Sequence, residues 1–105
     1  MVKRSGFITR RPDLSVEAFH AHWLNRHAEL VKEVARPRRY VVNLIDRRRY
    51  PDFPFDGFSE LWFDEESGWD VLLTPGSVVK EDEKNFTLPP NGVSMTEHVI
   101  VDGLR

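Results

Sequence analysis

The two side chains of this sequence best suited to moving a proton are His27 and Glu60. His27 falls on the same helical face as Phe19, Trp23 and Leu30, because these residues recur at three- and four-residue intervals. An imidazole titrates near neutral pH, so a histidine aimed at the protein interior can act as a general acid or base. The alternative is a structural histidine, hydrogen-bonded to a backbone carbonyl or a carboxylate. The residues alone leave both roles open.

Glu60 alternates with Phe58 and Trp62 in a segment that is otherwise apolar. A carboxylate is rarely buried without a partner. As a catalytic group, Glu60 would have a pKa raised by burial and would pair with a histidine, with His27 as the expected partner. The alternative is a salt bridge to an arginine such as Arg39. Alternation does not determine which face of the sheet Glu60 takes.

Five further residues are candidates for contacting a substrate: Trp23, Tyr40, Asn43, Trp62 and Phe86. Tyr40 can donate a hydrogen bond to a carbonyl, and Asn43, on the opposite side of the same predicted strand, can orient a polar group. The three other aromatic residues can line a pocket for a flat apolar ligand. The alternative is that the aromatic residues form the core and that Asn43 serves the backbone at a strand end.

The histidines of the first predicted helix do not have the spacing of a metal site. His20 and His27 are about two turns apart, and His22 should point away from the apolar face. A helical metal pair needs ligands at i and i+4, as in H-E-x-x-H, with a further ligand nearby. The sequence also lacks cysteine, a phosphate-binding loop and the G-x-G-x-x-G pattern. It therefore predicts neither a metal nor a flavin or nicotinamide cofactor.

The composition describes one small globular domain spanning residues 1–105. With 40% hydrophobic and 30% charged residues, the chain is not expected to be disordered, and it has no run of about 18 apolar residues that could enter a membrane. The net charge of −2 disfavours a nucleic-acid binder, and the basic run 47–49 is expected to be a solvated loop. Because the sequence does not open with a secretory signal, we expect a cytoplasmic location.

The elements that must position these residues follow from periodicity and turn signals. The sequence predicts a helix over 16–35, a broken second helix between 64 and 86, and strands over 2–10, 40–45, 57–63 and 93–101. The order βαββαβ is that of the ferredoxin-like fold, an α+β architecture with a four-stranded antiparallel sheet and helices on one face. The other face is too apolar to remain in water, which predicts a homodimer joined through it.

Three patterns in this order resemble the EthD family of the dimeric α/β-barrel superfamily. They are L-S-V-E-A-F over 14–19 followed by Trp23 and His27, R-Y-V-V-N over 39–43, and D-G-F-S-E-L-W-F-D over 56–64. The resemblance covers most of the chain and is weakest over 74–92. It implies a dimeric α/β-barrel domain over 1–105. His27 matches a histidine of the family, and this resemblance makes a catalytic role as well supported as a structural one.

The resemblance implies a small-molecule pocket without naming a substrate. Relatives in the superfamily include cofactor-independent monooxygenases, isomerases, polyketide cyclases and dehydratases. The function expected first is a cofactor-independent isomerase, cyclase, dehydratase or related lyase. In it, His27 transfers a proton of a hydrophobic oxygenated substrate, in a pocket between the first helix and the sheet. Two other functions stay open: a cofactor-free monooxygenase, and a non-catalytic ligand-binding or accessory protein of a catabolic pathway.

Overall fold

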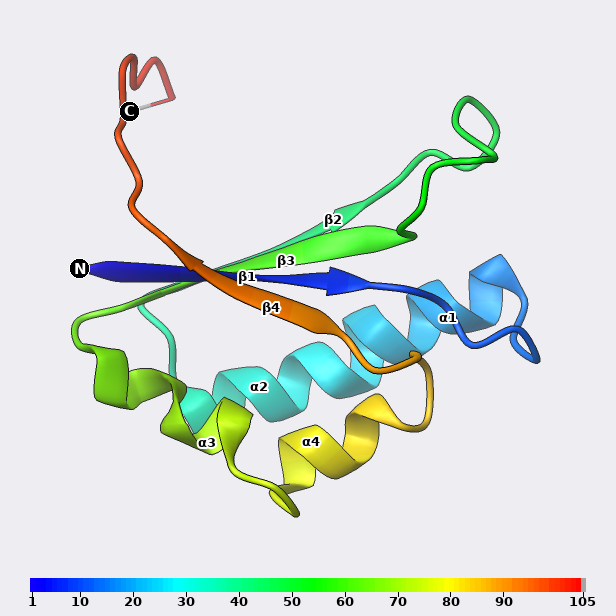
Figure 1. Ribbon diagram of the computed structural model, residues 1–105, viewed down its shortest axis with the longest axis horizontal. Coiled ribbons are helices and arrows are strands. Elements are labelled where there is room, and N and C mark those ends of the chain that lie inside the picture. Colours follow the sequence, from blue (N-terminus) through cyan, green and yellow to red (C-terminus); the bar gives the residue numbers. More distant parts are fainter. Residues whose placement is uncertain (105) are drawn as a thin grey trace.

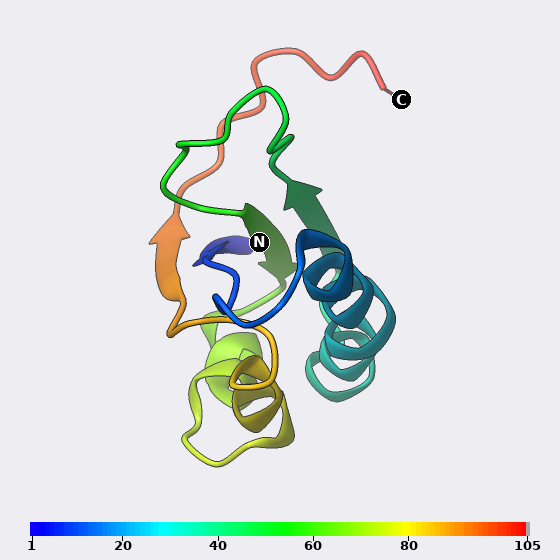
Figure 2. The ribbon, with the colours of Figure 1, turned by 90° about the vertical axis from the view of Figure 1, so that its right-hand side faces the viewer.

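A four-stranded antiparallel sheet organises the computed structural model, which describes residues 1–104. The elements follow along the chain as β1 (Val2–Ile8), α1 (Val16–His22), η1 (Trp23–His27), α2 (Ala28–Ala35), β2 (Arg39–Leu44), β3 (Gly57–Phe63), η2 (Glu66–Trp69), α3 (Asp70–Leu73), α4 (Val78–Glu83) and β4 (Asn91–Met95). The strands lie side by side in the order β2-β3-β1-β4. Figures 1 and 2 show the helices of residues 1–104 together on one face of the sheet. The predicted α+β, ferredoxin-like fold is confirmed.

The two central strands, β1 and β3, pair along their whole length, from Val2 opposite Phe63 to Ile8 opposite Gly57. Strand β3 has the predicted bounds, and β2 lies one residue earlier than predicted. Strand β1 stops at Ile8, short of the predicted end at residue 10. Beyond it, Arg10 makes only an isolated bridge with Thr87, so the chain has left the sheet.

The last strand is shorter than predicted, since β4 ends at Met95 and the expected strand was 93–101. Among the described residues 1–104, β4 lies at the edge of the sheet and pairs with β1 alone. The pairing of β4 with β1 ends at Met95, which lies opposite Lys3 near the start of β1. A strand gains ladder hydrogen bonds only where a neighbour is present. Residues 96–104 accordingly run away from the sheet toward the C-terminus (Figure 1).

The first helical element covers the predicted residues 16–35. Ser15 caps its start, because its hydroxyl accepts a hydrogen bond from the backbone N–H of Ala18 at 3.0 Å. The element ends at Arg36, whose φ of 51° is left-handed and stops further helical hydrogen bonding. Pro37 follows and could not continue the helix.

The middle of this element is a π-helical turn, η1. Its defining hydrogen bond runs from the N–H of Ala28 to the carbonyl of Trp23, five residues earlier instead of four. The core is split into two clusters, one that includes Trp23 at the start of this turn and one beyond the turn. They are Ile8, Phe19, Trp23 and Phe86 beside α1, and Val31, Leu61, Phe63, Trp69 and Val79 beside α2.

The predicted second helix is broken, as expected, into η2, α3 and α4. The break falls at 74–76, where Gly76 has a φ of 81° that favours glycine. Ser77 then caps α4, since its hydroxyl accepts a hydrogen bond from Lys80 N at 3.2 Å. No helix within residues 1–104 is long and apolar enough to cross a membrane.

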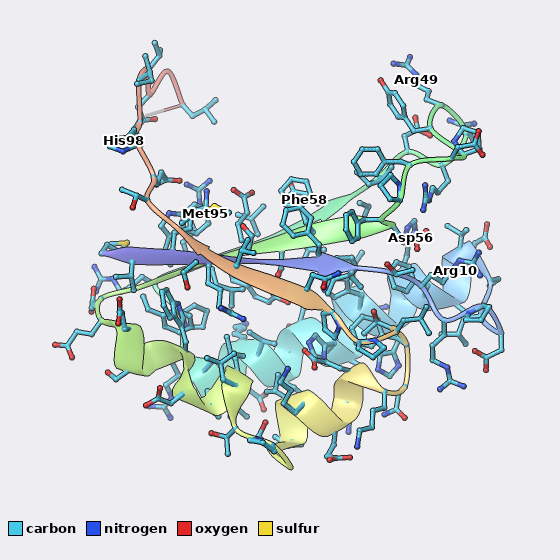
Figure 3. All side chains as sticks on the ribbon, in the orientation of Figure 1. Arg10, Arg49, Asp56, Phe58, Met95 and His98 are labelled. Carbon is cyan, nitrogen blue, oxygen red and sulfur yellow. The ribbon has the colours of Figure 1, made fainter. Side chains whose placement is uncertain are left out.

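Alternation along the strands divides their side chains between two faces. One set faces the helices and lines a cavity there, and it includes Arg4, Tyr40 and Leu61. The alternating set points to the opposite side, which we call the open face. Its members are Lys3, Ser5, Phe7, Arg39, Val41, Asn43, Phe58, Glu60, Trp62, Asn91, Val93 and Met95. Figure 3 shows Phe58 and Met95 on this side of the sheet, away from the helices.

Candidate functional site

A buried carboxylate, Asp82, lies between two histidines of the first helical element. Asp82 Oδ2 is 2.9 Å from His27 Nδ1, and both carboxylate oxygens are 3.0 Å from His22 Nε2. Asn85 Nδ2 donates a further hydrogen bond to Oδ1 at 3.1 Å. The side chains of Asp82 and His27 are 5% and 8% exposed, whereas that of His22 is 26% exposed. His27 therefore faces the interior, and His22 extends the cluster toward the surface.

Phe86 supports both imidazoles from one side. Its ring centroid is 5.0 Å from that of His22, in a stacked arrangement, and 4.8 Å from that of His27. Phe86 is fully buried and does not line the cavity described below. Its predicted contact with a substrate is thus replaced by a positioning contact with the histidines.

The π turn explains why His22 reaches Asp82. In an α-helix, residues five apart differ by about 140° around the axis, so His22 and His27 would point to different sides. A π turn closes a hydrogen bond between residues five apart and brings them to nearly the same side. The prediction that His22 points away from the apolar face is wrong, because it assumed α-helical periodicity throughout.

Hydrogen bonding and burial set the protonation states of Asp82 and His27. Burial raises the pKa of Asp82, but hydrogen bonds from Asn85, His22 and His27 outweigh this effect and hold the pKa below its ordinary value. Burial lowers the pKa of His27 below its ordinary value, although Asp82 opposes the shift. Neutral His27 donates its Nδ1–H to the ionised carboxylate, which leaves a lone pair on Nε2 that can accept a proton.

A cavity of about 90 Å³ lies between the first helical element and the sheet. His27, Trp23 and Tyr40 all line it, so the structure brings together three of the residues proposed from sequence. Burial raises the pKa of Tyr40 to about 12, so its phenol keeps its proton at neutral pH and can donate a hydrogen bond. A base and a neutral hydrogen-bond donor therefore share one small cavity.

Three charged side chains also line this cavity: Arg4 from β1, and Lys80 and Glu83 from α4. Lys80 Nζ lies 3.3 Å from Glu83 Oε1. Burial raises the pKa of Glu83 above its ordinary value, although the positive charges of Lys80 and Arg4 oppose the shift. No group of three or more histidine, cysteine or acidic side chains in the described part of the chain is arranged to hold a metal ion.

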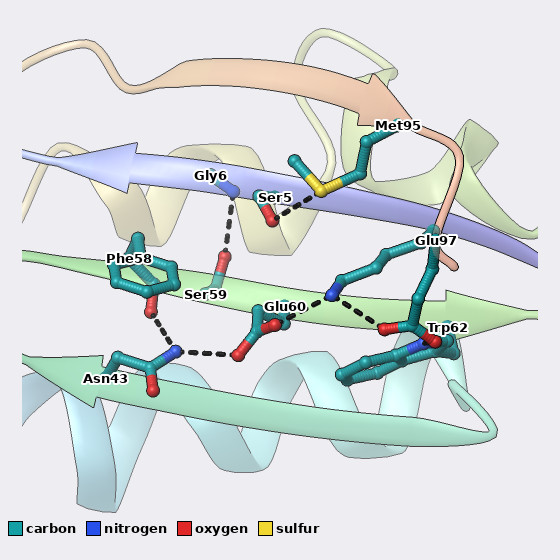
Figure 4. A network of polar contacts seen from close by, with 10 residues as sticks. Ser5, Gly6, Asn43, Phe58, Ser59, Glu60, Trp62, Met95 and Glu97 are labelled. Atoms are coloured by element: carbon teal, nitrogen blue, oxygen red, sulfur yellow. Dashed lines mark hydrogen bonds and ion pairs between the residues drawn. The ribbon is translucent and has the colours of Figure 1, made fainter. Parts of the chain in front are cut away.

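Glu60 lies on the open face, across the sheet from His27, so the predicted pairing of these two residues is wrong. Its carboxylate accepts hydrogen bonds from Lys3 Nζ at 2.8 Å and from Asn43 Nδ2 at 2.9 Å (Figure 4). Burial raises the pKa of Glu60, but these two hydrogen bonds outweigh it and hold the pKa below its ordinary value. Glu60 is an ionised partner of a lysine, where the sequence suggested a histidine or an arginine.

Asn43 and Trp62 belong to the same open-face network. Trp62 Nε1 donates to Glu97 Oε1 at 2.9 Å, and Glu97 Oε2 accepts from Lys3 Nζ at 2.9 Å. The cations of Lys3 and Arg39 lie 4.5 and 4.8 Å from the centroid of the Trp62 ring. Because this network is on the open face, neither Asn43 nor Trp62 contacts the cavity beside His27.

Several members of the site were not identified from the sequence: Asp82, His22, Asn85, Arg4, Lys80 and Glu83. Asp82 carried a detectable signal, since it lies three residues after Val79 and four before Phe86, both of which are buried. An acid at a core-facing helical position indicates a buried partner. The sequence offered no comparable signal for the π turn that brings His22 to this acid.

The stability of the protein should decrease at acid pH because His27 is buried. Its pKa in the fold is below the ordinary value, whereas the unfolded chain titrates near about 6.5. As the pH falls, the unfolded state binds the proton first, so stability should decrease from about pH 6.5 down to the pKa of the folded state. Calorimetry should show a decrease in Tm between about pH 7 and pH 5.5 that is smaller in His27→Asn. Equal decreases in the two proteins would contradict this.

Comparison with known proteins gives a family and a shared fold. The EthD domain model matches residues 11–90. An ethyl tert-butyl ether D (EthD) family protein from Bacillus halodurans C-125 is similar in structure, with a TM-score of 0.71 and 20% identity over 93% of this chain and 100% of that chain. A hypothetical Arabidopsis thaliana protein has a TM-score of 0.69 and 11% identity over 95% of this chain and 90% of that chain. No curated protein matches the sequence.

Proposed function

The chain belongs to the EthD family, and from this membership and the site we propose that it is a cofactor-independent enzyme that transfers a proton through His27. Its substrate is a hydrophobic oxygenated molecule, and its reaction is an isomerisation, cyclisation or elimination. The observation that carries the proposal is the position of His27. Its Nδ1 is 2.9 Å from the carboxylate of Asp82, and its side chain lines the cavity.

The reaction begins when Nε2 of His27 takes a proton from a carbon or hydroxyl beside the oxygenated group of the substrate. The electron pair of the broken bond moves toward the substrate oxygen, and the Tyr40 hydroxyl donates a hydrogen bond to that oxygen. The ionised carboxylate of Asp82 stabilises the imidazolium and orients the ring. Return of the proton to another substrate atom completes an isomerisation, and its delivery to a departing hydroxide completes an elimination with loss of water.

Hydrogen exchange in D₂O tests this function before the natural substrate is known. The protein is mixed with a panel of apolar ketones and 1,3-diketones, and proton NMR follows the loss of their acidic C–H signals. Wild-type protein should accelerate the exchange of at least one compound beyond the rate in buffer containing equimolar imidazole. A compound that binds in the cavity and exchanges no faster than in that buffer would instead support the non-catalytic, ligand-binding function.

We also propose that two copies of the chain pair through the open face. Phe7 and Phe58 stack there at 5.8 Å between ring centroids, and Val93 and Met95 are 43% and 38% exposed on the same face. The tail beyond β4 adds a second apolar surface at residues 99–101, which are largely exposed in the single chain. Apolar side chains gathered in this way favour a symmetric interface that removes them from water.

Phe58→Glu should convert the protein from a dimer to a monomer, because it places two like charges near the centre of a symmetric, desolvated interface. Sedimentation velocity at micromolar concentration measures the change. Leu24→Glu is the matched control, since Leu24 is 43% exposed in η1, on the helical side of the sheet. A wild-type protein that sediments as a folded monomer would contradict the proposed pairing.

A further inference from the structure

Arg4 differs from the other charged side chains that line the cavity. Its guanidinium makes no hydrogen bond and no ion pair within residues 1–104. The other cation, Lys80, is 3.3 Å from the carboxylate of Glu83. With two cationic side chains and one acidic side chain on its wall, the cavity carries an excess of positive charge. The charge of Arg4 is felt by Glu83, but the N–H donors of its guanidinium make no hydrogen bond within residues 1–104. A partly buried guanidinium with free donors attracts an anion, because it presents several N–H groups in one plane.

Gly92 of β4 fixes where this guanidinium lies. A Cβ atom added at Gly92 would stand 2.8 Å from Arg4 Cζ, closer than real side chains approach. Both residues line the cavity. The absence of a side chain at position 92 therefore allows the guanidinium to rest on the backbone of β4 and to remain on the wall that also holds His27.

The shape of the surroundings limits the rest of a ligand. The cavity beside His27 measures about 90 Å³, enough for only a few heavy atoms, since one water occupies about 30 Å³ in the liquid. An outer groove of about 430 Å³ adjoins it and shares Leu73, Lys80, Glu83 and Pro90 with its wall. Pro75 and Pro89 add apolar surface to that groove. A ligand can thus place a small polar end inside and an apolar part outside.

We propose that Arg4 binds the carboxylate of the substrate, which is a small organic acid with an apolar tail. The inference deepens the proposed function, because it assigns a substrate class to the same cavity. The carboxylate accepts hydrogen bonds from the guanidinium, and the tail follows the outer groove past Leu73 and Pro89. A separate oxygenated group of the acid accepts the hydrogen bond of Tyr40 and takes up the electron pair, so that the C–H or O–H beside this group faces Nε2 of His27. Charge-assisted contacts of this kind are about twice as strong as neutral hydrogen bonds.

Binding of hexanoate and of its neutral analogue hexanamide tests the assignment. Isothermal titration calorimetry at neutral pH should show that wild-type protein binds hexanoate and binds hexanamide at least about tenfold more weakly, because one charge-assisted contact is lost. Arg4→Gln should weaken hexanoate at least about tenfold and weaken hexanamide less, because the amide loses only a neutral hydrogen bond. Arg26→Gln is the matched control, since Arg26 is exposed in η1 and does not line the cavity, and it should bind hexanoate normally.

Gly92→Ala is a second variant, which keeps the positive charge of Arg4 but moves its guanidinium. The added methyl group should push the guanidinium away and weaken hexanoate binding, while circular dichroism shows an intact fold. Absence of hexanoate binding to wild-type protein, or equal affinity in wild-type protein and a folded Arg4→Gln, would overturn the proposal. His27→Asn distinguishes the carboxylate site at Arg4 from the proposed proton transfer. If this variant binds hexanoate normally and wild-type protein accelerates the exchange of no compound, the proposed reaction is contradicted and the carboxylate site is supported.

Discussion

His27→Asn is expected to lower the rate of hydrogen exchange catalysed by the protein by about 10²- to 10⁴-fold, the usual contribution of a general acid or base. Asparagine keeps the approximate size of the side chain and one hydrogen bond to Asp82, and it removes the titrating nitrogen that lines the cavity. The melting temperature should stay within a few degrees of the wild-type value. Exchange of a responsive ketone, followed by proton NMR in D₂O, gives the rate of each protein.

A purely structural His27 would reverse the order of the two effects. The melting temperature of His27→Asn would then fall by several degrees, and the remaining folded protein would exchange its substrate at the wild-type rate. His98→Asn controls for a general loss of imidazole, because His98 is exposed on the tail beyond β4 (Figure 3). This control should leave both the rate and the melting temperature unchanged.

Asp82→Asn should also lower the exchange rate by about 10²- to 10⁴-fold, although residue 82 does not line the cavity. The neutral amide cannot stabilise the imidazolium of His27. Its NH₂ group can also face Nδ1 and force the tautomer in which Nε2 carries the hydrogen and no longer acts as a base. Because Asp82 raises the pKa of His27, the variant should lower that pKa further. Nitrogen-15 NMR of the imidazole reports both its pKa and its tautomer.

Asp70→Asn is the matched control for this substitution, because Asp70 is exposed at the start of α3. It should exchange at the wild-type rate with an unchanged His27 spectrum. If Asp82→Asn shifts the imidazole signals and yet leaves the rate unchanged, then Asp82 holds the fold together and takes no part in the reaction.

The sheet and the long helix could be predicted because their signals are local. Strand β3 alternates side chains at every second position over Gly57–Phe63, and the bounds were predicted correctly. The same alternation shows that Phe58, Glu60 and Trp62 share a face, but it cannot say which one. That choice depends on register, since Lys3 and Glu60 become neighbours only when β1 pairs with β3.

Asp82 could not be predicted as a partner of His27 for a related reason. Asp82 and His27 are 55 residues apart, and no periodic pattern connects them. Their contact arises because α4 packs beside η1 on the same face of the sheet (Figure 1). The histidine was recognisable from its own helix, whereas its partner could be assigned only once the two helices were placed together.

The π turn amounts to one inserted residue in an otherwise α-helical element. Phe19 and Val31 are twelve residues apart and would differ by about 120° on a continuous α-helix, but eleven residues would bring them within about 20°. The turn absorbs the extra residue, so both side chains face the sheet in their separate core clusters. His22 and His27 are accordingly presented like a pair four residues apart. A relative with one residue fewer in this helix could present the same pair, and an ungapped alignment of the two chains would misplace one of its histidines.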